Sequence, residues 1–312
     1  MPYVARSLEE GRYRGVVARG LAAAWAEVSV RGLARPVPFP AHVHVVAVGG
    51  ATLGGSGKTP LAIACARELA RLGARVAFVG HGYRARPQRA RFVSPNDALG
   101  EVGDEALVAA RALEAHGVRV VVAPSRALAV ELAARAADVL VLDGVLQTRP
   151  APASLSLLAV DAEEPWGSAA AVPPRGDLRA PIAALLAAAD VVVPVGQDSP
   201  DATVSSAGAH LGGSFLAWEA LRPLRLGLAC ALARPRRLMR SLARHGIRPV
   251  AVALAQDHHS ISPDAMRGPV DLWLTTAKCA LHIPPQRVPL ATLEYDVACS
   301  PTLAGRLLCR AP

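Results

Sequence analysis

Aromatic side chains are scarce in this sequence: Phe, Trp and Tyr make up 4% of its 312 residues, although hydrophobic residues make up 52%. A core with so few rings is built from Ala, Leu and Val, which suits helices packed closely against a sheet. The chain length accommodates one large or two ordinary domains. Interleaved aromatic and basic stretches that read RNA or DNA are also missing, so no nucleic-acid partner is expected.

Cysteines are few and are not arranged in pairs along the sequence. The five are Cys65, Cys230, Cys279, Cys299 and Cys309. No two of them have the C-x-x-C spacing, and their number is odd. The pattern argues against a disulfide framework and against a zinc site, and it favours a reducing compartment.

Long apolar runs are absent as well. No run approaches the roughly 20 residues that a membrane-spanning helix needs. The charged residues Glu9, Glu10 and Arg12 interrupt the N-terminus where a signal peptide would have its apolar core. We therefore expect neither a transmembrane segment nor a secretory signal.

The first thirty residues have the pattern of an amphipathic helix over 7–30. One face carries Val17, Leu21, Trp25 and Val28, and the other carries Arg12, Arg19, Glu27 and Arg31. Such a helix either lies on an anionic membrane with Trp25 at the interface, or packs its apolar face on the domain. Periodicity alone does not separate the two arrangements.

Positive charge predominates: the net charge is +9, and arginine supplies nearly all the cations. A basic surface favours anionic partners. Because nucleic acid is not expected, the remaining candidates are anionic lipid and phosphorylated substrates. Nothing in the sequence indicates an obligate protein partner.

Apolar strand-like runs alternate with helix-like runs through the first two-thirds of the chain. The predicted strands cover 43–48, 75–79, 118–122, 138–142, 155–160 and 190–194, and the predicted helices cover 59–72, 104–115, 125–137 and 181–189. Unbroken apolar strands are typical of a sheet that is buried on both faces. The alternation predicts an α/β fold with a mostly parallel sheet covered by helices on both sides.

A glycine-rich turn stands between the first predicted strand and the first of these helices. Its sequence TLGGSGKT comprises Thr52, Leu53, Gly54, Gly55, Ser56, Gly57, Lys58 and Thr59. Backbone N–H groups in such a P-loop point at a β-phosphate, Lys58 reaches the β- and γ-phosphates, and the Thr59 hydroxyl can ligate Mg²⁺. Thr52 replaces the first glycine of the G-x-x-x-x-G-K-[ST] pattern. The alternative is a glycine-rich turn with a chance Lys-Thr.

Acidic residues stand at three places where chemistry can occur. Asp143 ends a buried apolar strand and is the expected Mg²⁺ partner of the P-loop; the alternative is an ordinary Asp-Gly turn. Asp104 and Glu105 open a predicted helix, where an aspartate is usually a cap. The stretch 257–259, Asp-His-His, fits a solvated loop or a weak metal pair.

The composition divides the chain into four predicted segments. A polar, glycine-rich stretch begins near residue 197, and a second α/β pattern follows it. We predict an N-terminal helix at 1–30, a P-loop NTPase-type domain at 31–200, a β-linker at 201–222 and a smaller α/β domain at 223–312. A cleft between two domains is a natural active site.

In order along the chain, these segments resemble the tetraacyldisaccharide 4'-kinases (lipid A 4'-kinases). The family's P-loop GGTGKTP appears as GGSGKTP, its VGDE is found at 102–105, and its DHH is found at 257–259. Diverged matches are DGVLQT at 143–148, GDLRAP at 176–181, ALARP at 231–235 and TAKC at 276–279. The order and approximate spacing match over residues 40–282.

The resemblance implies transfer of the γ-phosphate of ATP to the 4'-hydroxyl of an acylated disaccharide 1-phosphate, with ATP and Mg²⁺ as cofactors. Because that acceptor is a lipid, it also implies a cytoplasmic enzyme bound peripherally to the inner face of the cytoplasmic membrane. It further implies a P-loop domain joined by a β-linker to a smaller α/β domain.

The resemblance also assigns roles to residues. By match with the family, Asp104 is the catalytic aspartate, His258 is the histidine that pairs with it, and Arg179 is a clamp for phosphate charge. Closure of two domains would bring Asp104 and His258 together. Further family positions, without a firm role, are matched by Glu105, Arg126 and Gln147.

The chain departs from the family pattern at several positions. Gly144 replaces an aspartate, Thr148 a histidine, His81 an arginine, Ala180 a glutamate and Cys279 an aspartate. Loss of a carboxylate beside a metal typically costs about 10–100-fold in affinity or activity. Two alternatives to a kinase of a divergent branch therefore stay open: a catalytically weakened or repurposed homologue, and a membrane-associated P-loop ATPase switch.

Overall fold

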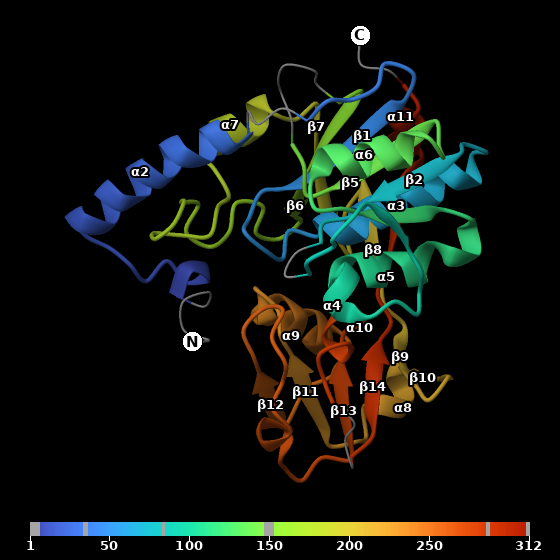
Figure 1. The fold of residues 1–312 in the computed structure, drawn as a ribbon. Helices are drawn as coiled ribbons and strands as arrows, with labels where there is room; N and C mark the ends of the chain where they lie inside the picture. Colours follow the sequence, from blue (N-terminus) through green and yellow to red (C-terminus); the bar gives the residue numbers. More distant parts are fainter. Residues whose placement is uncertain (1–6, 34–36, 83–84, 147–152, 285–287, 310–312) are drawn as a thin grey trace. The chain divides into compact units, whose positions relative to one another are not determined.

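The computed structural model describes residues 7–33, 37–82, 85–146, 153–284 and 288–309 (Figure 1). The chain forms two compact units. The larger unit contains Leu8–Val204 and the segment from Val297 onward, and the smaller unit contains Ser205–Asp296, with which Ser7 is also grouped. The chain therefore leaves the larger unit once and returns to it.

A nine-stranded sheet forms the centre of the larger unit. Its strand order is β15 (Asp296–Cys299), β8 (Ala202–Ser205), β7 (Val191–Gly196), β6 (Leu155–Asp161), β1 (His44–Gly50), β5 (Val139–Asp143), β2 (Val76–Val79), β4 (Arg119–Val122) and β3 (Arg91–Val93). Pairing from β8 to β4 is parallel, and β3 runs antiparallel on β4. The predicted mostly parallel sheet is confirmed.

Helices cover both faces of this sheet (Figure 1). They are α3 (Lys58–Arg71), α5 (Asp104–Leu113), α6 (Arg126–Ala134), α7 (Ile182–Ala187) and α11 (Pro301–Leu307), with a single turn, α4 (Leu99–Val102), before α5. Small residues of α6, such as Ala129 and Ala133, pack on Val45, Ala47 and Leu140 of the strands. Alanine-rich helices approach a sheet closely, which explains a core with few aromatic rings.

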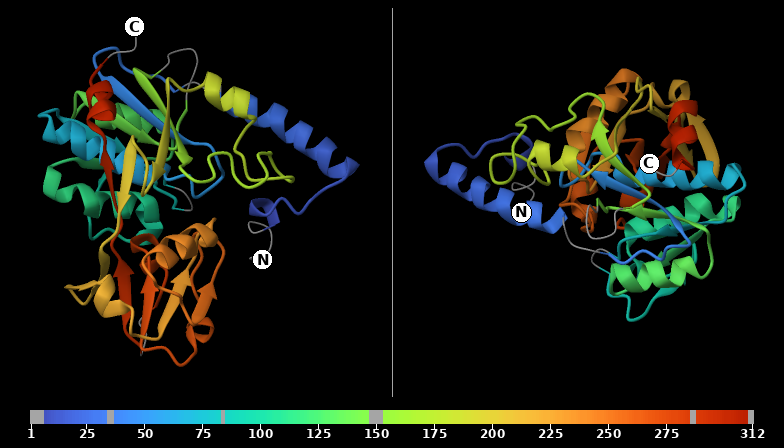
Figure 2. Two further views of the ribbon diagram at one scale, coloured as in Figure 1. Left: turned by 180° about the vertical axis from the view of Figure 1, so that it is seen from behind. Right: turned by 90° about the horizontal axis from the view of Figure 1, so that it is seen from above.

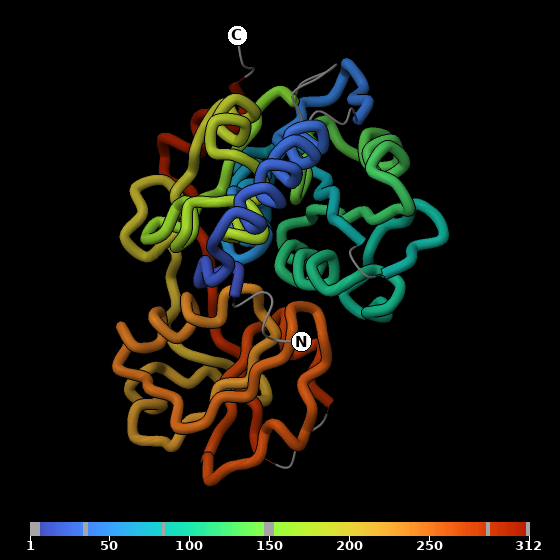
Figure 3. The backbone as a smooth tube through the Cα atoms, turned by 90° about the vertical axis from the view of Figure 1, so that its left-hand side faces the viewer, coloured from blue at the N-terminus to red at the C-terminus, as the bar shows by residue number. Residues whose placement is uncertain are grey.

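The N-terminal helix α2 (Val16–Leu33) packs through its small residues. Ala18 and Ala22 are buried, and Ala22 joins an apolar cluster with Leu178 and Leu185. Figures 2 and 3 show this helix extending away from the sheet and lying beside the yellow-green segment that precedes α7. The arrangement in which the large apolar side chains pack on the domain is therefore not the one observed.

Those large apolar side chains of α2 are exposed instead. Val17 is 78% exposed, Val28 66%, Leu21 57% and Trp25 42%. Within the described ranges, none of the helices combines the length and the apolarity that crossing a bilayer requires. The helix thus presents an apolar stripe to its surroundings without being a membrane-spanning segment.

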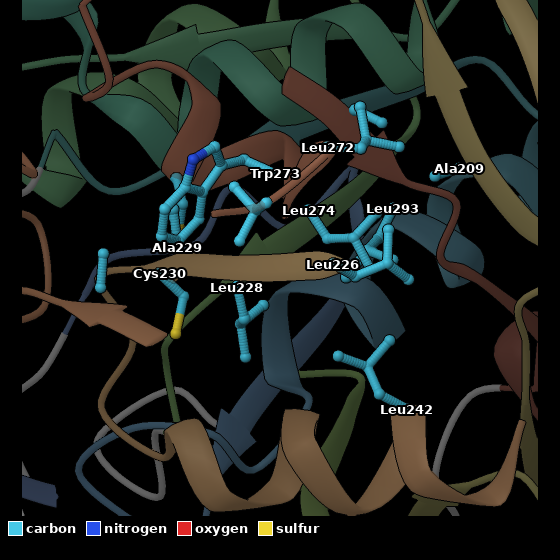
Figure 4. Close-up of a cluster of buried hydrophobic side chains, with 14 of the residues drawn as sticks. Ala209, Leu226, Leu228, Ala229, Cys230, Leu242, Leu272, Trp273, Leu274 and Leu293 are labelled. Carbon is cyan, nitrogen blue, oxygen red and sulfur yellow. The ribbon is translucent and has the colours of Figure 1, made fainter. Parts of the chain in front are cut away.

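The smaller unit is built on a six-stranded sheet. Its order is β10 (Ser214–Ala217), β9 (Gly208–Leu211), β14 (Leu290–Leu293), β13 (Leu272–Thr275), β11 (Leu226–Cys230) and β12 (Ala251–Leu254). Its helices are α8 (Trp218–Leu221), α9 (Pro235–Arg244) and α10 (Ala277–Ala280). Figure 4 shows Trp273 on one side of β11 and Leu242 of α9 on the other, both within one buried apolar cluster.

The chain's two passages between the units differ from the predicted segments. The segment 201–222 supplies β8 to the large sheet and β9 and β10 to the small sheet. Residues 297–312 were predicted to continue the smaller domain, whereas they group with the larger unit. β15 lies next to β8 at the sheet edge, and α11 buries Leu303 and Leu307.

Candidate active site

The P-loop connects β1, which ends at Gly50, with α3, which begins at Lys58. Gly55 and Gly57 have φ angles of 74° and 81°, in the left-handed region that favours glycine. A β-carbon at Gly50 would collide with the Ser56 hydroxyl, because the turn folds tightly back on the strand. The glycines therefore let backbone N–H groups line the inside of the turn.

Thr52, which replaces the first glycine of the motif, is accommodated within this turn. Its buried hydroxyl donates a hydrogen bond of 2.7 Å to the carbonyl of Gly54. The Leu53 N–H donates to the carbonyl of Asp177 at 2.8 Å, which ties the loop to the segment before α7. The departure at Thr52 thus adds a hydrogen bond and does not disrupt the cradle.

Lys58 at the start of α3 is held by a carboxylate from α5. Its Nζ lies 3.3 Å from Oε1 of Glu105 and donates to the Thr59 hydroxyl at 3.1 Å. The Lys58 and Glu105 side chains are only 18% and 16% exposed. Glu105 is therefore the partner that a phosphate would replace on Lys58.

Thr59 and Asp143 form the second contact of the site. The Thr59 hydroxyl donates to Oδ2 of Asp143 at 2.7 Å. Oδ1 of Asp143 is buried and accepts no hydrogen bond from the described residues. Burial raises the pKa of Asp143, Lys58 opposes that shift, and Glu105 adds to it.

This pair of oxygen ligands fits Mg²⁺. Mg²⁺ takes only one or two protein oxygens and completes its octahedron with water and phosphate oxygens. The orphaned Oδ1 of Asp143 and the Thr59 hydroxyl supply such oxygens at the end of β5 and the start of α3. Over the residues described, no group of three or more His, Cys, Asp or Glu side chains forms another metal cluster.

Asp104 lies at the N-terminus of α5 and is buried. Gly103 before it has a φ of 86°, and Oδ1 of Asp104 accepts a hydrogen bond of 2.8 Å from the N–H of Glu105. Because Glu105 contacts Lys58, the same helix terminus brings both acids to the P-loop side of the sheet. A carboxylate at this end of a helix is favoured by the helix dipole.

Two arginines border the same site. Arg179 follows the segment bound to the P-loop, and its N–H donates to the carbonyl of Ala51 at 2.9 Å. Arg126 begins α6, and its Nη1 is buried and has no hydrogen-bond partner among the described residues. Burial lowers the pKa of both guanidinium groups, and Asp143 opposes that shift in each.

Arg126 also occupies the space beside Gly144. A β-carbon built at Gly144, whose φ is 77°, would lie 3.3 Å from Nη2 of Arg126. The aspartate that the resemblance leads one to expect at position 144 is absent, and the guanidinium of Arg126 borders the space. Sequence reasoning left Arg126 and Glu105 without a role. The feature that could have pointed to a role for Arg126 is its position at the N-terminus of a predicted helix, where a positive charge is unfavourable.

A pocket of about 350 Å³ opens beside the P-loop. Four of its lining residues come from α2, and the rest come from the segment before β1, the end of β1, the P-loop, the turn after β5 and Arg179. They are Trp25, Ser29, Gly32, Leu33, Val37, Gly49, Gly50, Leu53, Gly144, Val145, Leu146 and Arg179. The apolar N-terminal helix and the phosphate cradle thus share one cavity.

Other predicted positions are located as follows. His258 follows β12 in the smaller unit, so its pairing with Asp104 of the larger unit stays a prediction. Gln147 and Thr148 lie outside the described residues. Ala180 is fully buried in an apolar cluster with Leu178, which explains why no glutamate stands there. Cys279 is buried and its sulfur accepts a hydrogen bond from the Ala231 N–H.

A family model described as tetraacyldisaccharide-1-P 4'-kinase matches residues 16–309. The chain belongs to this family. It is similar to the tetraacyldisaccharide 4'-kinases of Brucella ovis and Brucella abortus, with 33% identity to each. Each alignment covers 88% of this chain and 86% of the Brucella protein.

The chain is also similar to a solved structure, the "apo" form of LpxK from Aquifex aeolicus in complex with ATP. The TM-score is 0.67 and the identity 20%, over 93% of this chain and 98% of that one. At this identity the likeness concerns the fold, and it agrees with the predicted combination of a P-loop domain and a smaller α/β domain.

Proposed function

We infer that this 4'-kinase family member transfers the γ-phosphate of ATP to the 4'-hydroxyl of a tetraacyldisaccharide 1-phosphate in lipid A biosynthesis. The observation that carries the inference is the glycine-lined P-loop, with Lys58 paired to Glu105 and Thr59 bound to Asp143, in a chain of this family. The names of the Brucella relatives and the ATP named with the Aquifex structure support it.

The proposed nucleotide site consists of the residues 52–59. Backbone N–H groups of the turn and the N-terminus of α3 hold the β-phosphate, and Lys58 exchanges Glu105 for phosphate oxygens. Thr59 and Asp143 hold the Mg²⁺, which neutralises charge on the phosphates when it is bound. Arg126 and Arg179 supply further positive charge, and Nη1 of Arg126, which has no hydrogen-bond partner among the described residues, is a donor for an acceptor oxygen.

The acceptor hydroxyl needs a base because a sugar alcohol is a poor nucleophile until its proton is removed. Asp104 is proposed for this step, since it is a buried carboxylate on the same helix terminus as the partner of Lys58. His258 is proposed to orient Asp104. The proton of the 4'-hydroxyl moves to a carboxylate oxygen of Asp104 as the bond from that oxygen to the γ-phosphorus forms, while the bond from the γ-phosphorus to the bridging oxygen breaks and ADP leaves.

The lipid nature of the acceptor matches the exposed apolar stripe of α2. We propose that Val17, Leu21 and Val28 enter the interface of the inner leaflet while the alanine face holds the helix to the enzyme. The pocket that α2 shares with the P-loop then connects the membrane side of the protein to the phosphate site. The net charge of +9 favours an anionic surface.

The direct test is phosphorylation of a tetraacyl disaccharide 1-phosphate in detergent micelles with γ-labelled ATP and Mg²⁺. Label is expected in the lipid product, with Lys58→Ala as the inactive control. Folding of each protein is checked by circular dichroism. Absence of labelled lipid at high concentrations of folded enzyme contradicts the proposal.

The same assay separates the alternatives. A P-loop ATPase switch hydrolyses ATP without a lipid acceptor, and a catalytically silent homologue binds ATP without transfer or hydrolysis. The proposed kinase releases ADP in equal amount to phosphorylated lipid. ADP release that is independent of the disaccharide favours the switch.

A further inference from the structure

Lysine is almost absent from this chain. Of its 34 lysines and arginines, only two are lysines, Lys58 and Lys278. Lys58 belongs to the phosphate cradle, whereas Lys278 lies in the smaller unit. An ammonium is a compact charge with three donors, and a planar guanidinium does not replace it where two acceptors converge. A lysine kept among arginines therefore indicates a site with a specific geometric demand.

The fold brings Lys278 to the loop that holds His258. Thr276 caps the short helix α10 that follows β13, and Lys278 is the second residue of that helix. Asp257 and His258 follow β12. Because β12 and β13 are both parallel to β11 and flank it, their carboxyl ends meet at one edge of the sheet.

Three side chains meet at this edge. Nζ of Lys278 donates to Oδ1 of Asp257 at 2.9 Å and lies 3.2 Å from Nε2 of His258. Oδ2 of Asp257 is 3.5 Å from the same Nε2. All three belong to the smaller unit.

The chemistry of the ammonium decides which ring nitrogen carries the proton. An ammonium has no lone pair, so the short contact requires Nε2 of His258 to accept. The proton of a neutral ring then resides on Nδ1. A competing Nε2–H donor would face Oδ2 of Asp257, at a distance at the outer limit of a hydrogen bond.

The backbone of His258 supports a specific role for the ring. Its φ is 60°, in the left-handed region that costs a non-glycine residue free energy unless the surroundings hold it there. The contacts to Lys278 and Asp257 are such a restraint. The strain is consistent with a ring that is aimed in one direction.

We propose that Lys278, anchored by Asp257, is a positioning residue that fixes His258 as the Nδ1–H tautomer. Nδ1–H of His258 is then a hydrogen-bond donor. Nε2, which would have to pass a proton onward, is occupied by the hydrogen bond from Lys278. Its catalytic consequence rests on the proposed function: His258 orients the carboxylate of Asp104 by donating to it and does not relay the proton.

The tautomer is read directly by nuclear magnetic resonance. Protein labelled with ¹⁵N-histidine is recorded at pH 8 in a long-range ¹H–¹⁵N correlation, and the His258 ring is assigned by its absence in His258→Gln. The wild-type ring is expected as the Nδ1–H form. An Nε2–H form or an imidazolium in the wild type overturns the proposal, whether or not the protein has kinase activity.

A variant shows whether Lys278 is responsible. Lys278→Met keeps the length of the side chain and removes the donor, and the ring is expected to change to the Nε2–H form facing Asp257. A ring that stays Nδ1–H in the folded variant overturns the role of Lys278. The matched control is Arg267→Met, which removes an exposed cation paired with Asp264 in the same unit.

Kinetics test the consequence for turnover. In Lys278→Met, kcat is expected to fall on the order of 10- to 100-fold, as for other groups that orient a reacting side chain. The KM for ATP is expected to stay unchanged, because the nucleotide contacts lie in the other unit. A tautomer change without loss of kcat overturns the catalytic consequence, whereas absence of any wild-type turnover concerns the proposed function alone.

Discussion

Arg126 is the residue of the site whose placement is hardest to explain by stability. It stands at the N-terminus of α6, where the helix dipole disfavours a cation by about 0.3–1 kcal/mol. Its Nη1 is buried without a partner among the described residues. We propose that this placement serves binding, with a phosphate oxygen as the acceptor of Nη1.

Arg126→Gln is therefore expected to weaken nucleotide binding while stabilising the nucleotide-free protein. Loss of a charge-assisted hydrogen bond of about 1.5–3 kcal/mol corresponds to about 10- to 100-fold in Kd for ATP. Calorimetry measures the affinity, and thermal melting without nucleotide measures the stability. Arg135→Gln at the other end of α6, in an exposed pair with Glu131, is the control. Unchanged affinity in Arg126→Gln contradicts the role.

Asp104 is the proposed general base. Asp104→Asn keeps the size of the side chain and removes the basic oxygen, so kcat is expected to fall about 10²- to 10⁴-fold. ATP affinity is expected to change little, because Lys58, Thr59 and Asp143 are intact. The comparison protein is Asp138→Asn, an exposed aspartate paired with Arg75 just before β5. Full activity in Asp104→Asn removes the assignment.

At the scale of elements, much of the larger unit followed from the sequence. The predicted strands at 43–48 and 138–142 correspond to β1 and β5, which pair in register from His44 with Val139. Unbroken apolar runs leave little alternative to a buried parallel strand. The P-loop and the end of β5 meet for the same reason, so the contact between Thr59 and Asp143 was within reach of sequence reasoning.

The orientation of α2 was not within reach. A hydrophobic pattern weights large side chains, so Val17, Leu21 and Trp25 mark the apolar face of the sequence. The protein instead packs Ala18 and Ala22, because small residues let the helix approach the segment before α7. The hydrophobic pattern indicates which residues avoid water, but it does not indicate whether protein or lipid covers them.

The exposed stripe of α2 makes a prediction about membranes. Val17→Ser with Leu21→Ser removes two exposed apolar side chains, so binding to anionic phospholipid vesicles is expected to weaken by at least about tenfold. The melting temperature is expected to stay within about 2 °C. Vesicle co-sedimentation measures the binding.

A matched pair of changes controls for the loss of surface apolarity. Val250→Ser with Val252→Ser removes two exposed valines of the smaller unit, which are 63% and 44% exposed. This control is expected to bind vesicles like the wild type. Equal loss of binding in both double variants would mean that general surface apolarity, and not α2, determines membrane contact.

At the scale of the whole molecule, the buried thiol of Cys230 makes the stability of the smaller unit depend on pH. Burial raises the pKa of Cys230 to about 12, and a nearby Cys279 adds to the shift. The folded state keeps a proton that the unfolded state loses above its ordinary pKa of 9.0. The stability of the smaller unit is therefore expected to fall as pH rises past about 9.

Cys230→Ala removes that proton linkage. Urea unfolding followed at pH 7 and pH 10 is expected to show a larger loss of stability in the wild type than in the variant. The difference between the two proteins is the measured quantity, so contributions from other groups cancel. A wild type and a variant that lose stability equally between these pH values contradict the linkage.

The return of the chain to the larger unit was the feature of the whole molecule that escaped prediction. β15 is four residues long, and α11 is a short helix, so neither carries a strong local signal. Their place depends on distant contacts, such as Arg67 donating to the carbonyl of Val297 at 2.7 Å and the ring of His44 bonding the carbonyl of Leu307. Local pattern does not contain such pairings.

That return also orders events on the ribosome. β15 is the edge strand of the large sheet, yet its residues from Val297 onward are translated after the smaller unit. Domains commonly fold as they emerge from the ribosome. The smaller unit can therefore fold before β15 of the larger unit has been synthesised. A stop codon near residue 296 would leave the large sheet without this edge strand and would expose the edge of β8.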